Sequence, residues 1–385
     1  MTEDEKIHDA NKCQPDTTPL SSSAQECRIR LCKSLKNTLS RINNANLNCE
    51  INDTSTETVS NSHNAGTLRA LILSGGVDTC AILEAASDIG MRFDVCITVV
   101  IGDESPDEKF AAFAAKQHGY AHVHHVVRMT SQELVKTYLP RAVQLLQTWD
   151  GMTIRNSLVI SAAFHKAKEL GIHHVIVGDG ADELFGGYSF MWGSEDDVTL
   201  WKKKRDDMCR KWTFATKKLA SSYDIRSHGP FMDEEFVEWA LANTARSDCI
   251  GERPIKLVLD GESLLHTAGK IVLREAFETC ASWRRKDPIE VGSGATVISK
   301  DEYWSEELSD GDYQREKERL LTNEGIVIQS KEYMINLWAY IQAFGGICHP
   351  EKKRLKIGEG CAGCCFEIGE ANFCFICGAW PAQRK

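Results

Sequence analysis

The chain has 385 residues, of which 42% are hydrophobic and 26% charged, so it can form one large or two medium-sized folded domains. Its formal net charge of −10 argues against a general nucleic-acid coat protein, because such proteins carry basic faces. No apolar run approaches the about 18 residues of a transmembrane helix, and the acidic start differs from a signal or transit peptide. We therefore expect a cytoplasmic protein with neither a membrane nor nucleic acid as its partner.

The first 66 residues are mostly polar. Residues 1–24 and 46–66 are rich in Ser, Thr and Asn and contain few apolar side chains, so we expect them to be disordered or flexible. Between these stretches, apolar residues recur with the spacing of one helical face: Ile29, Cys32, Leu35, Leu39 and Ile42. The sequence thus predicts an N-terminal extension over residues 1–66 that contains one helix and is otherwise disordered.

Strands and helices alternate after this extension. The apolar runs LRALIL, VCITVVI and HHVIV stand beside helix-patterned segments such as FAAFAAKQHG. This alternation is typical of a doubly wound α/β fold with a mostly parallel sheet. Beyond about residue 190 the pattern becomes mainly helical. We expect one domain over residues 67–345 and a small Cys-rich tail over residues 346–385.

A glycine-rich segment, SGGVDT at residues 74–79, separates the strand LRALIL from the helix CAILEAASDIG. A glycine pair at such a junction lets backbone N–H groups approach phosphate oxygens closely. Ser74 and Thr79 add hydroxyl donors, and Asp78 offers a hard oxygen ligand for Mg²⁺. The lysine of a Walker loop is missing, and the glycines alone would equally fit a tight turn.

A second segment rich in glycine and acid, VIVGDGADELFGGY at residues 175–188, follows another expected strand. Ligands of open α/β sheets bind at the carboxyl ends of the strands, so both segments are expected to face one site. The carboxylates of Asp179, Asp182 and Glu183 suit Mg²⁺ binding and proton transfer. The alternative interpretation is an acidic loop that caps the helix beginning near Asp182.

Together these segments resemble the synthetase domain of the asparagine synthetase family, which includes β-lactam synthetases. The resemblance covers roughly residues 68–295 and includes further blocks in the same order, among them LQTWDGMTIRNSLVISAAFHKAKELG, YDIRSHGPFMDEEFVEWAL, KIVLREAF and WRRKDPIEVGSGA. It implies a fold like that of the adenine nucleotide alpha hydrolases. It also implies an AMP-forming ligase, which activates a carboxylate with ATP, releases pyrophosphate and then forms an amide.

The resemblance also implies roles for individual residues. Nucleotide contacts would come from the first segment and from glycines near it: Leu73, Ser74, Gly75, Gly76, Asp78, Thr79, Gly102, Gly178 and Gly180. Asp78 and Asp182 would hold Mg²⁺, while Asp179 and Glu183 would serve catalysis, Asp179 in proton transfer or substrate positioning. Lys286 would neutralise charge on the phosphates, the alternative being a surface cation in the basic run RRK.

The chain departs from the glutamine-dependent members of that family, in which a cysteine follows the initiator Met. Thr2 stands there instead, so we expect no glutamine hydrolysis by that route. Nitrogen would come from free ammonia, a partner amidotransferase or an amine on the substrate. Aspartate is the usual carboxylate of the family, and a charged insert over residues 191–225 lies near the expected acceptor pocket.

The tail contains two close thiol pairs, Cys361 with Cys364 and Cys374 with Cys377, separated by nine residues. This spacing is typical of a zinc ribbon, in which tetrahedral Zn²⁺ stabilises a segment too short to fold alone. Cys365 is a spare thiol that leaves the choice of ligand open. Unliganded thiols and an iron–sulfur cluster are the alternatives for the tail.

Two other functions stay open at this point. Some relatives with the SGGVDT-like loop modify tRNA and carry zinc ribbons, although the GDGADELFGGY segment and the negative net charge favour the amide ligase. A non-catalytic nucleotide-binding scaffold is the third possibility. The joint presence of Ser74, Asp78, Asp182 and Lys286 argues against it.

Overall fold

The computed structural model describes residues 20–50, 68–193, 198–278 and 282–384. Most of the predicted N-terminal disorder lies outside these ranges. Within them, helix α2 (Ser22–Glu50) includes the predicted helix and is longer than it at both ends: the apolar residues that predict the helix run only from Ile29 to Ile42. Ser21 Oγ accepts a hydrogen bond from the Ala24 N–H at the start of α2, and no Gly or Pro interrupts the polar residues near its end.

Five parallel strands form the central sheet, in the order β3-β2-β1-β4-β5. Their bounds are Arg69–Ile72 for β1, Val95–Ile101 for β2, His124–Met129 for β3, His174–Ile176 for β4 and Arg226–His228 for β5. The chain reverses its direction of strand addition between β1 and β4, the point at which open α/β sheets bind ligands. The predicted doubly wound α/β fold is therefore confirmed.

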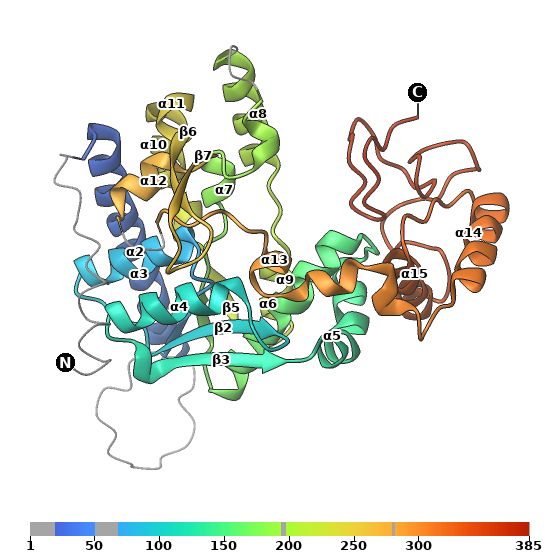
Figure 1. The fold of residues 1–385 in the computed structure, drawn as a ribbon, viewed down its shortest axis with the longest axis horizontal. Coiled ribbons are helices and arrows are strands. Elements are labelled where there is room, and N and C mark those ends of the chain that lie inside the picture. The colour runs from blue at the N-terminus through green and yellow to red at the C-terminus, as the bar shows by residue number, and fades with distance from the viewer. Residues whose placement is uncertain (1–19, 51–67, 194–197, 279–281, 385) are drawn as a thin grey trace.

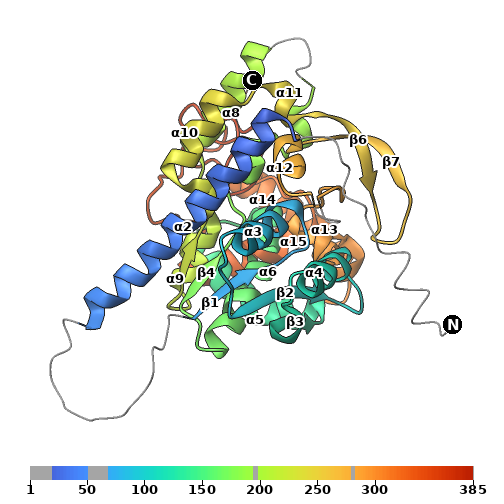
Figure 2. The same ribbon diagram turned by 90° about the vertical axis from the view of Figure 1, so that its left-hand side faces the viewer.

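Alternate residues of the strands point into two hydrophobic cores, one on each face of the sheet. Ala70 and Ile97 pack with one set of helices, α5 (Ser131–Leu146), α6 (Gly151–Glu169) and α9 (Ala215–Ser221). Leu71 and Cys96 pack with the opposite set: α2, α3 (Val77–Asp88), α4 (Pro106–Gln117), α10 (Glu234–Asn243) and α12 (Ile271–Ala276). Figure 2 shows α2 running diagonally across the molecule beside α3 and α10. Because both faces are covered, β2 is buried along its whole length.

Shorter elements complete the architecture. An antiparallel hairpin, β6 (Gly251–Lys256) with β7 (Ser263–Ala268), projects from the body. The other α-helices among the described residues are α7 (Ala181–Leu184), α8 (Val198–Lys211), α11 (Arg246–Cys249), α13 (Ile289–Gly292), α14 (Asp310–Glu324) and α15 (Lys331–Phe344). Five 3₁₀ turns are described: η1 (Ala121–Val123), η2 (Ser189–Met191), η3 (Pro230–Met232), η4 (Ala295–Ser299) and η5 (Asp301–Trp304).

The Cys-rich tail lies beyond α15, at the end of the molecule opposite α2 (Figure 1). Its described residues form turns and one isolated antiparallel bridge, between Arg354 and Phe366. Phe366 and Ile376 belong to the same hydrophobic core as Trp149 and Tyr340, so the tail packs directly on α15 and the start of α6. None of the described helices is both long and apolar enough to span a membrane.

Candidate functional site

The SGGVDT segment forms a tight loop between β1 and α3, and its hydroxyl side chains organise its own backbone. Thr79 Oγ1 accepts the Ser74 N–H at 3.2 Å, and Ser74 Oγ accepts the Gly76 N–H at 3.3 Å. The cap residue of α3 is Gly76, which has no side chain to occupy the first-turn N–H groups. These donors can therefore bind an anion at the positive end of the helix dipole.

Close packing requires the glycines of both motifs. Gly75 has φ +69°, and a Cβ there would lie 2.5 Å from the backbone nitrogen of Ala111 in α4. A Cβ on Gly178, just after β4, would lie 3.1 Å from Cβ of Asp78. The loop after β4 thus lies against the loop after β1, which places the two motifs side by side at the switch point of the sheet.

Two carboxylates and two ammonium groups meet beside the loop. Lys270 Nζ lies 2.7–2.8 Å from both carboxylate oxygens of Asp78 and 2.7 Å from Oδ1 of Asp182. Lys286 Nζ donates to Oδ2 of Asp182 at 2.7 Å. The structure therefore brings together Asp78, Asp182 and Lys286, and it adds Lys270, whose side chain is only 1% exposed.

The charges of this centre shift the pKa values of its members. Burial alone would raise the pKa of Asp182, but the ammonium groups of Lys270 and Lys286 outweigh it and hold that pKa well below its usual range. For Lys286, burial acts to lower the pKa, and the carboxylates of Asp182 and Asp78 raise it above the ordinary value. Asp182 and Lys286 are thus ionised at neutral pH, with their opposite charges in direct contact.

The other two acids of the second motif, Asp179 and Glu183, have raised pKa values. Burial raises the pKa of Asp179 to about 6, the charges of Glu183 and Asp182 add to the rise, and a hydrogen bond from Thr216 opposes it. Oδ2 of Asp179 is shielded from solvent and has no hydrogen-bond partner among the described residues. Glu183 accepts a hydrogen bond from the hydroxyl of Tyr188 at 2.7 Å, and burial raises its pKa as well. Asp179 can therefore hold or exchange a proton near neutral pH.

A buried arginine supports the loop from its other side. Arg284 donates to the carbonyl of Ser74 at 3.2 Å and to Oδ1 of Asp107 at 2.7 Å. Its guanidinium also lies over the ring of Phe110, 4.7 Å from the centroid. Because Arg284 belongs to the same segment as Lys286, this contact fixes the segment against the phosphate loop.

The remaining predicted nucleotide contacts lie nearby, at the carboxyl edge of the sheet. Leu73 has a fully buried side chain, so only its backbone can contact a ligand. Gly102 follows β2 with φ +87°, and its N–H donates to the carbonyl of Met129. Gly180 has φ +100° and begins α7.

Sequence reasoning missed several residues of the centre. Lys270 begins the block KIVLREAF, Arg284 belongs to WRRKDPIEVGSGA, and Tyr188 ends the second motif, yet none of them carries a local signal of its own. Lys270 has φ +60° at the start of α12, a conformation uncommon for lysine. That conformation is visible only in the folded chain, where it helps to place the ammonium group between the two acids.

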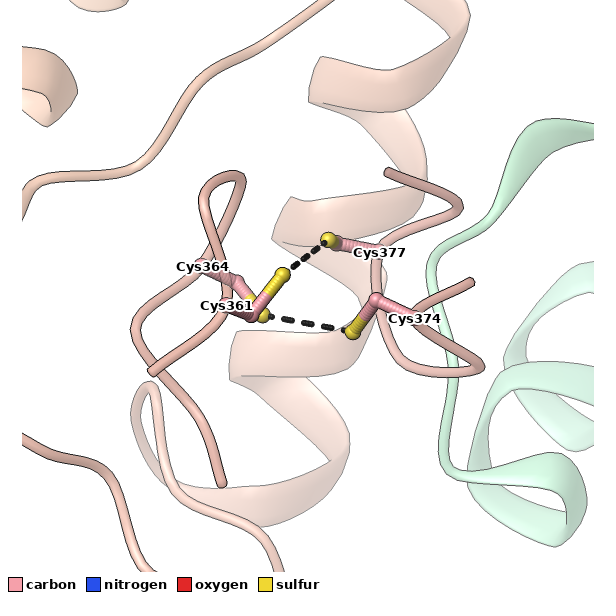
Figure 3. Close-up of side chains that lie close together, drawn as sticks. All are labelled: Cys361, Cys364, Cys374 and Cys377. Atoms are coloured by element: carbon pink, nitrogen blue, oxygen red, sulfur yellow. Dashed lines mark hydrogen bonds between the residues drawn. The ribbon is translucent and has the colours of Figure 1, made fainter. Parts of the chain in front are cut away.

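The two thiol pairs of the tail come from two turns that face each other (Figure 3). All four thiols are buried and lie within 4.8 Å of one another, with 3.6 Å between Sγ of Cys361 and Cys377 and between Sγ of Cys364 and Cys374. This four-cysteine cluster can hold a tetrahedral metal ion. Sγ of the spare Cys365 instead approaches the carbonyl of Gly325 at 3.5 Å, outside the cluster.

The second of these turns packs on the segment that begins α6. The carbonyl of Ile376 accepts the Trp149 N–H at 2.8 Å and the Thr148 hydroxyl at 3.1 Å. Asp150 caps α6 through the Thr153 N–H and also accepts the hydroxyl of Tyr333 at 2.9 Å. The four-cysteine cluster and the start of α6 are therefore joined by direct hydrogen bonds.

Sequence comparison finds relatives among the asparagine synthetases. Asparagine synthetase B [glutamine-hydrolyzing] of Escherichia coli is 26% identical over 201 residues, which are 50% of this chain and 33% of that protein. Asparagine synthetase [glutamine-hydrolyzing] 1 of Arabidopsis thaliana is 25% identical over 281 residues, or 66% of this chain and 43% of that protein. The chain thus spans less than half the length of these relatives.

One solved structure, "U34-tRNA thiolase NcsA from Methanococcus maripaludis with its [4Fe-4S] cluster", is similar over 83% of this chain and 89% of that one. Its sequence identity is 14% and its TM-score 0.28, values too low to support an argument about function. The family model of asparagine synthase matches residues 51–207, which include both motifs. Residues 51–207 are therefore similar to the asparagine synthase family, as the two motifs predict.

Proposed function

We propose that the protein is an ATP-dependent ligase that activates a substrate carboxylate as its adenylate and then forms an amide. A carboxylate oxygen would attack the α-phosphorus of ATP, the bond to the β-phosphate would break, and pyrophosphate would leave. An amine or ammonia would then attack the acyl carbon, releasing AMP and a proton. The observation that carries this proposal is the meeting of Asp78, Asp182, Lys270 and Lys286 beside the phosphate loop.

The loop supports binding of the phosphates. Its glycines let α4 pack closely, and the uncapped N–H groups at the start of α3 point their dipole at the carboxyl edge of the sheet. Lys286 and Lys270 would neutralise the charge that accumulates as pyrophosphate departs. Such placed positive charges supply most of the catalysis in phosphoryl chemistry.

The two acids of the centre fit a divalent cation. Three of their oxygens converge on one point, where Lys270 Nζ lies within 2.8 Å of each. Asp78 and Asp182 would therefore hold Mg²⁺ through hard oxygen ligands, with Lys270 moving aside from part of its present position. When bound, Mg²⁺ supplies charge that stabilises the pyrophosphate as it leaves.

Asp179 would act on the acceptor side of the site. Its raised pKa and unpartnered oxygen suit a group that positions the attacking amine and takes up its proton. Glu183, which accepts the hydroxyl of Tyr188, adds to the raised pKa of Asp179 through its charge. Aspartate is the carboxylate that we propose first, since the family relatives are asparagine synthetases.

We further propose that the four-cysteine cluster binds Zn²⁺ in a structural role. Four buried thiols held by two facing turns match a closed structural site better than an open catalytic one. Its position at the start of α6 would let the metal stabilise the tail and that helix together.

Pyrophosphate release tests the ligase proposal. The purified chain is incubated with ATP and Mg²⁺, with aspartate and ammonia or with other carboxylates, while pyrophosphate, AMP and product are measured. Equal amounts of AMP, pyrophosphate and asparagine identify an asparagine-forming ligase. If no carboxylate raises the rate above that of Asp78→Ala, the proposal fails. Dependence on added tRNA would support the tRNA-modifying alternative instead.

A further inference from the structure

Shielded polar atoms without hydrogen-bond partners occur on α6, on α15 and on the segment that contains α13. Among the described residues, this cluster comprises six such atoms: Arg155 Nε, Asn156 Oδ1, Glu290 Oε2, Ser293 Oγ, Glu332 Oε1 and Asn336 Nδ2. All but Asn156 and Arg155 belong to side chains that are at most 8% exposed. An unmade buried hydrogen bond costs about 1–3 kcal/mol, so such a group calls for an explanation.

Helix α6 packs against both α13 and α15, which brings the three segments into one region. Glu332 and Asn336 lie four residues apart on α15, and Glu290 and Ser293 lie three apart along α13 and its end. An ion pair between Arg155 and Glu332 joins α6 to α15. Burial raises the pKa of Glu332 to about 7, the pair with Arg155 opposes this, and the nearby charges of Asp150 and Glu290 add to it. We call this set the α6–α13–α15 cluster.

The charges of the cluster do not balance. Of the four charged side chains Asp150, Arg155, Glu290 and Glu332, three are carboxylates and one is a guanidinium. Asp150 is already satisfied by Thr153 and Tyr333, so the unmatched oxygens are those of the two glutamates. The complement of this arrangement is a cation that donates hydrogen bonds. Four of the unpartnered atoms can accept hydrogen bonds, so an ammonium group, which donates in several directions, suits them: Asn156 Oδ1, Glu290 Oε2, Ser293 Oγ and Glu332 Oε1.

A short segment links this cluster to the phosphate loop. At one end, Arg284 donates to the carbonyl of Ser74. At the other end, the carbonyl of Ser293 accepts the Ile101 N–H at 2.8 Å, at the carboxyl end of β2. Lys286 and Glu290 lie between these anchors, the first at the loop centre and the second in the cluster. Figure 1 shows the α13 segment between the sheet and α15.

We infer that the α6–α13–α15 cluster binds the ammonium group of the nitrogen-bearing substrate, with Glu290 and Glu332 as its anionic partners. This inference deepens the proposed ligase function and rests on it for the identity of the substrate. The ammonium group belongs either to free ammonium or to an amino-acid substrate. The excess of carboxylates over cations in the cluster is then explained, because the bound ammonium group supplies the missing positive charge.

Binding without turnover provides the test. The melting temperature of the full chain is measured in ammonium chloride and methylammonium chloride against sodium chloride at equal ionic strength, and in aspartate against succinate. Wild type is expected to be stabilised by the amine-bearing member of at least one comparison, because a ligand bound only to the native state raises its stability. Stabilisation by the simple ammonium salts identifies free ammonium, and stabilisation by aspartate but not succinate identifies an amino acid.

Variants decide whether the glutamates are responsible. Glu290→Gln and Glu332→Gln should weaken the apparent affinity for the stabilising amine by about tenfold or more while leaving ATP binding nearly unchanged. Asn336→Asp, which adds a carboxylate, should strengthen that affinity, a gain that misfolding cannot mimic. Glu318→Gln, on the exposed side of α14, is the matched control and should respond as wild type does.

Two results would overturn the inference: no amine-specific stabilisation of wild type, or unchanged affinity in both glutamine variants. The assay uses neither ATP nor turnover, so its failure is separate from that of the ligase proposal. Pyrophosphate release without an amine response rejects only the cluster, and an amine response without pyrophosphate release rejects only the ligase.

Discussion

The phosphate-loop centre and the four-cysteine cluster are assembled in opposite ways. The four thiols of the tail lie within 17 residues of sequence, from Cys361 to Cys377, and their spacing alone predicts the ligand set. The loop centre draws Asp78, Asp182, Lys270 and Lys286 from segments that are up to 208 residues apart. The ligands of a local site can be predicted from the spacing of residues in the sequence. The members of a dispersed site are brought together only by the order of strands in the sheet.

The largest effect is expected at the residue that joins the dispersed site. Lys270→Gln would leave the adjacent carboxylates of Asp78 and Asp182 without the cation that they share. We expect the rate of pyrophosphate release to fall by about 100-fold or more, as it does when one preorganised charge is removed from an active site. Lys136→Gln, on the exposed face of α5, is the control. A fall of less than about threefold would show that Lys270 is structural only.

At the four-cysteine cluster, we expect a substitution to lower the stability of the fold rather than the rate of the reaction. Cys374→Ser removes one of four ligands, so we expect bound zinc to be lost and the free energy of unfolding to fall by about 3 kcal/mol. Metal content by elemental analysis and denaturant unfolding measure the two effects. Cys348→Ser, at an exposed thiol outside the cluster, should change neither. Full retention of metal in Cys374→Ser would contradict the proposed ligand set.

The contact between the tail and α6 can be tested by two glycines with similar backbones. Gly378 has φ +73° and Gly369 has φ +56°, so alanine strains both. Only at Gly378 would the new Cβ clash, 2.1 Å from Oδ1 of Asp150, whereas nothing lies within 4 Å at Gly369. We expect Gly378→Ala to cost about 2–3 kcal/mol of unfolding free energy and Gly369→Ala about 1 kcal/mol. Equal losses would mean that the tail packs independently of α6.

The same contrast explains what the sequence could predict. Apolar runs beside helical patterns were sufficient for the parallel sheet, and the two motifs were sufficient to place Asp78 and Asp182 at one edge. The partner of both acids, Lys270, was not predictable, because its left-handed backbone and its approach to the loop arise only from tertiary packing. For the same reason, the joining of the tail to Trp149 and Asp150 has no signal in the spacing of its cysteines.

The smallest effect is expected at Asp179, an acid of the second motif for which the described residues form no ion pair. The pKa of Asp179 rises from 3.8 to about 6 on folding, so the folded state keeps a proton that the unfolded state releases between these values. Ionisation of Asp179 therefore costs no stability below about pH 4, and the cost grows with pH until it is complete above about pH 6. The substitution Asp179→Asn removes this cost.

We expect the stability of Asp179→Asn relative to wild type to increase by about 1–3 kcal/mol between pH 4 and pH 7, measured by denaturant unfolding. Asp224→Asn is the control, because a hydrogen bond from Lys168 lowers the pKa of Asp224 and its effect on stability is therefore nearly constant over this pH range. Its left-handed backbone, φ +59°, also accepts asparagine. If both variants change in parallel, the carboxyl of Asp179 is solvated in the folded protein, and the role proposed for it in proton transfer loses its physical basis.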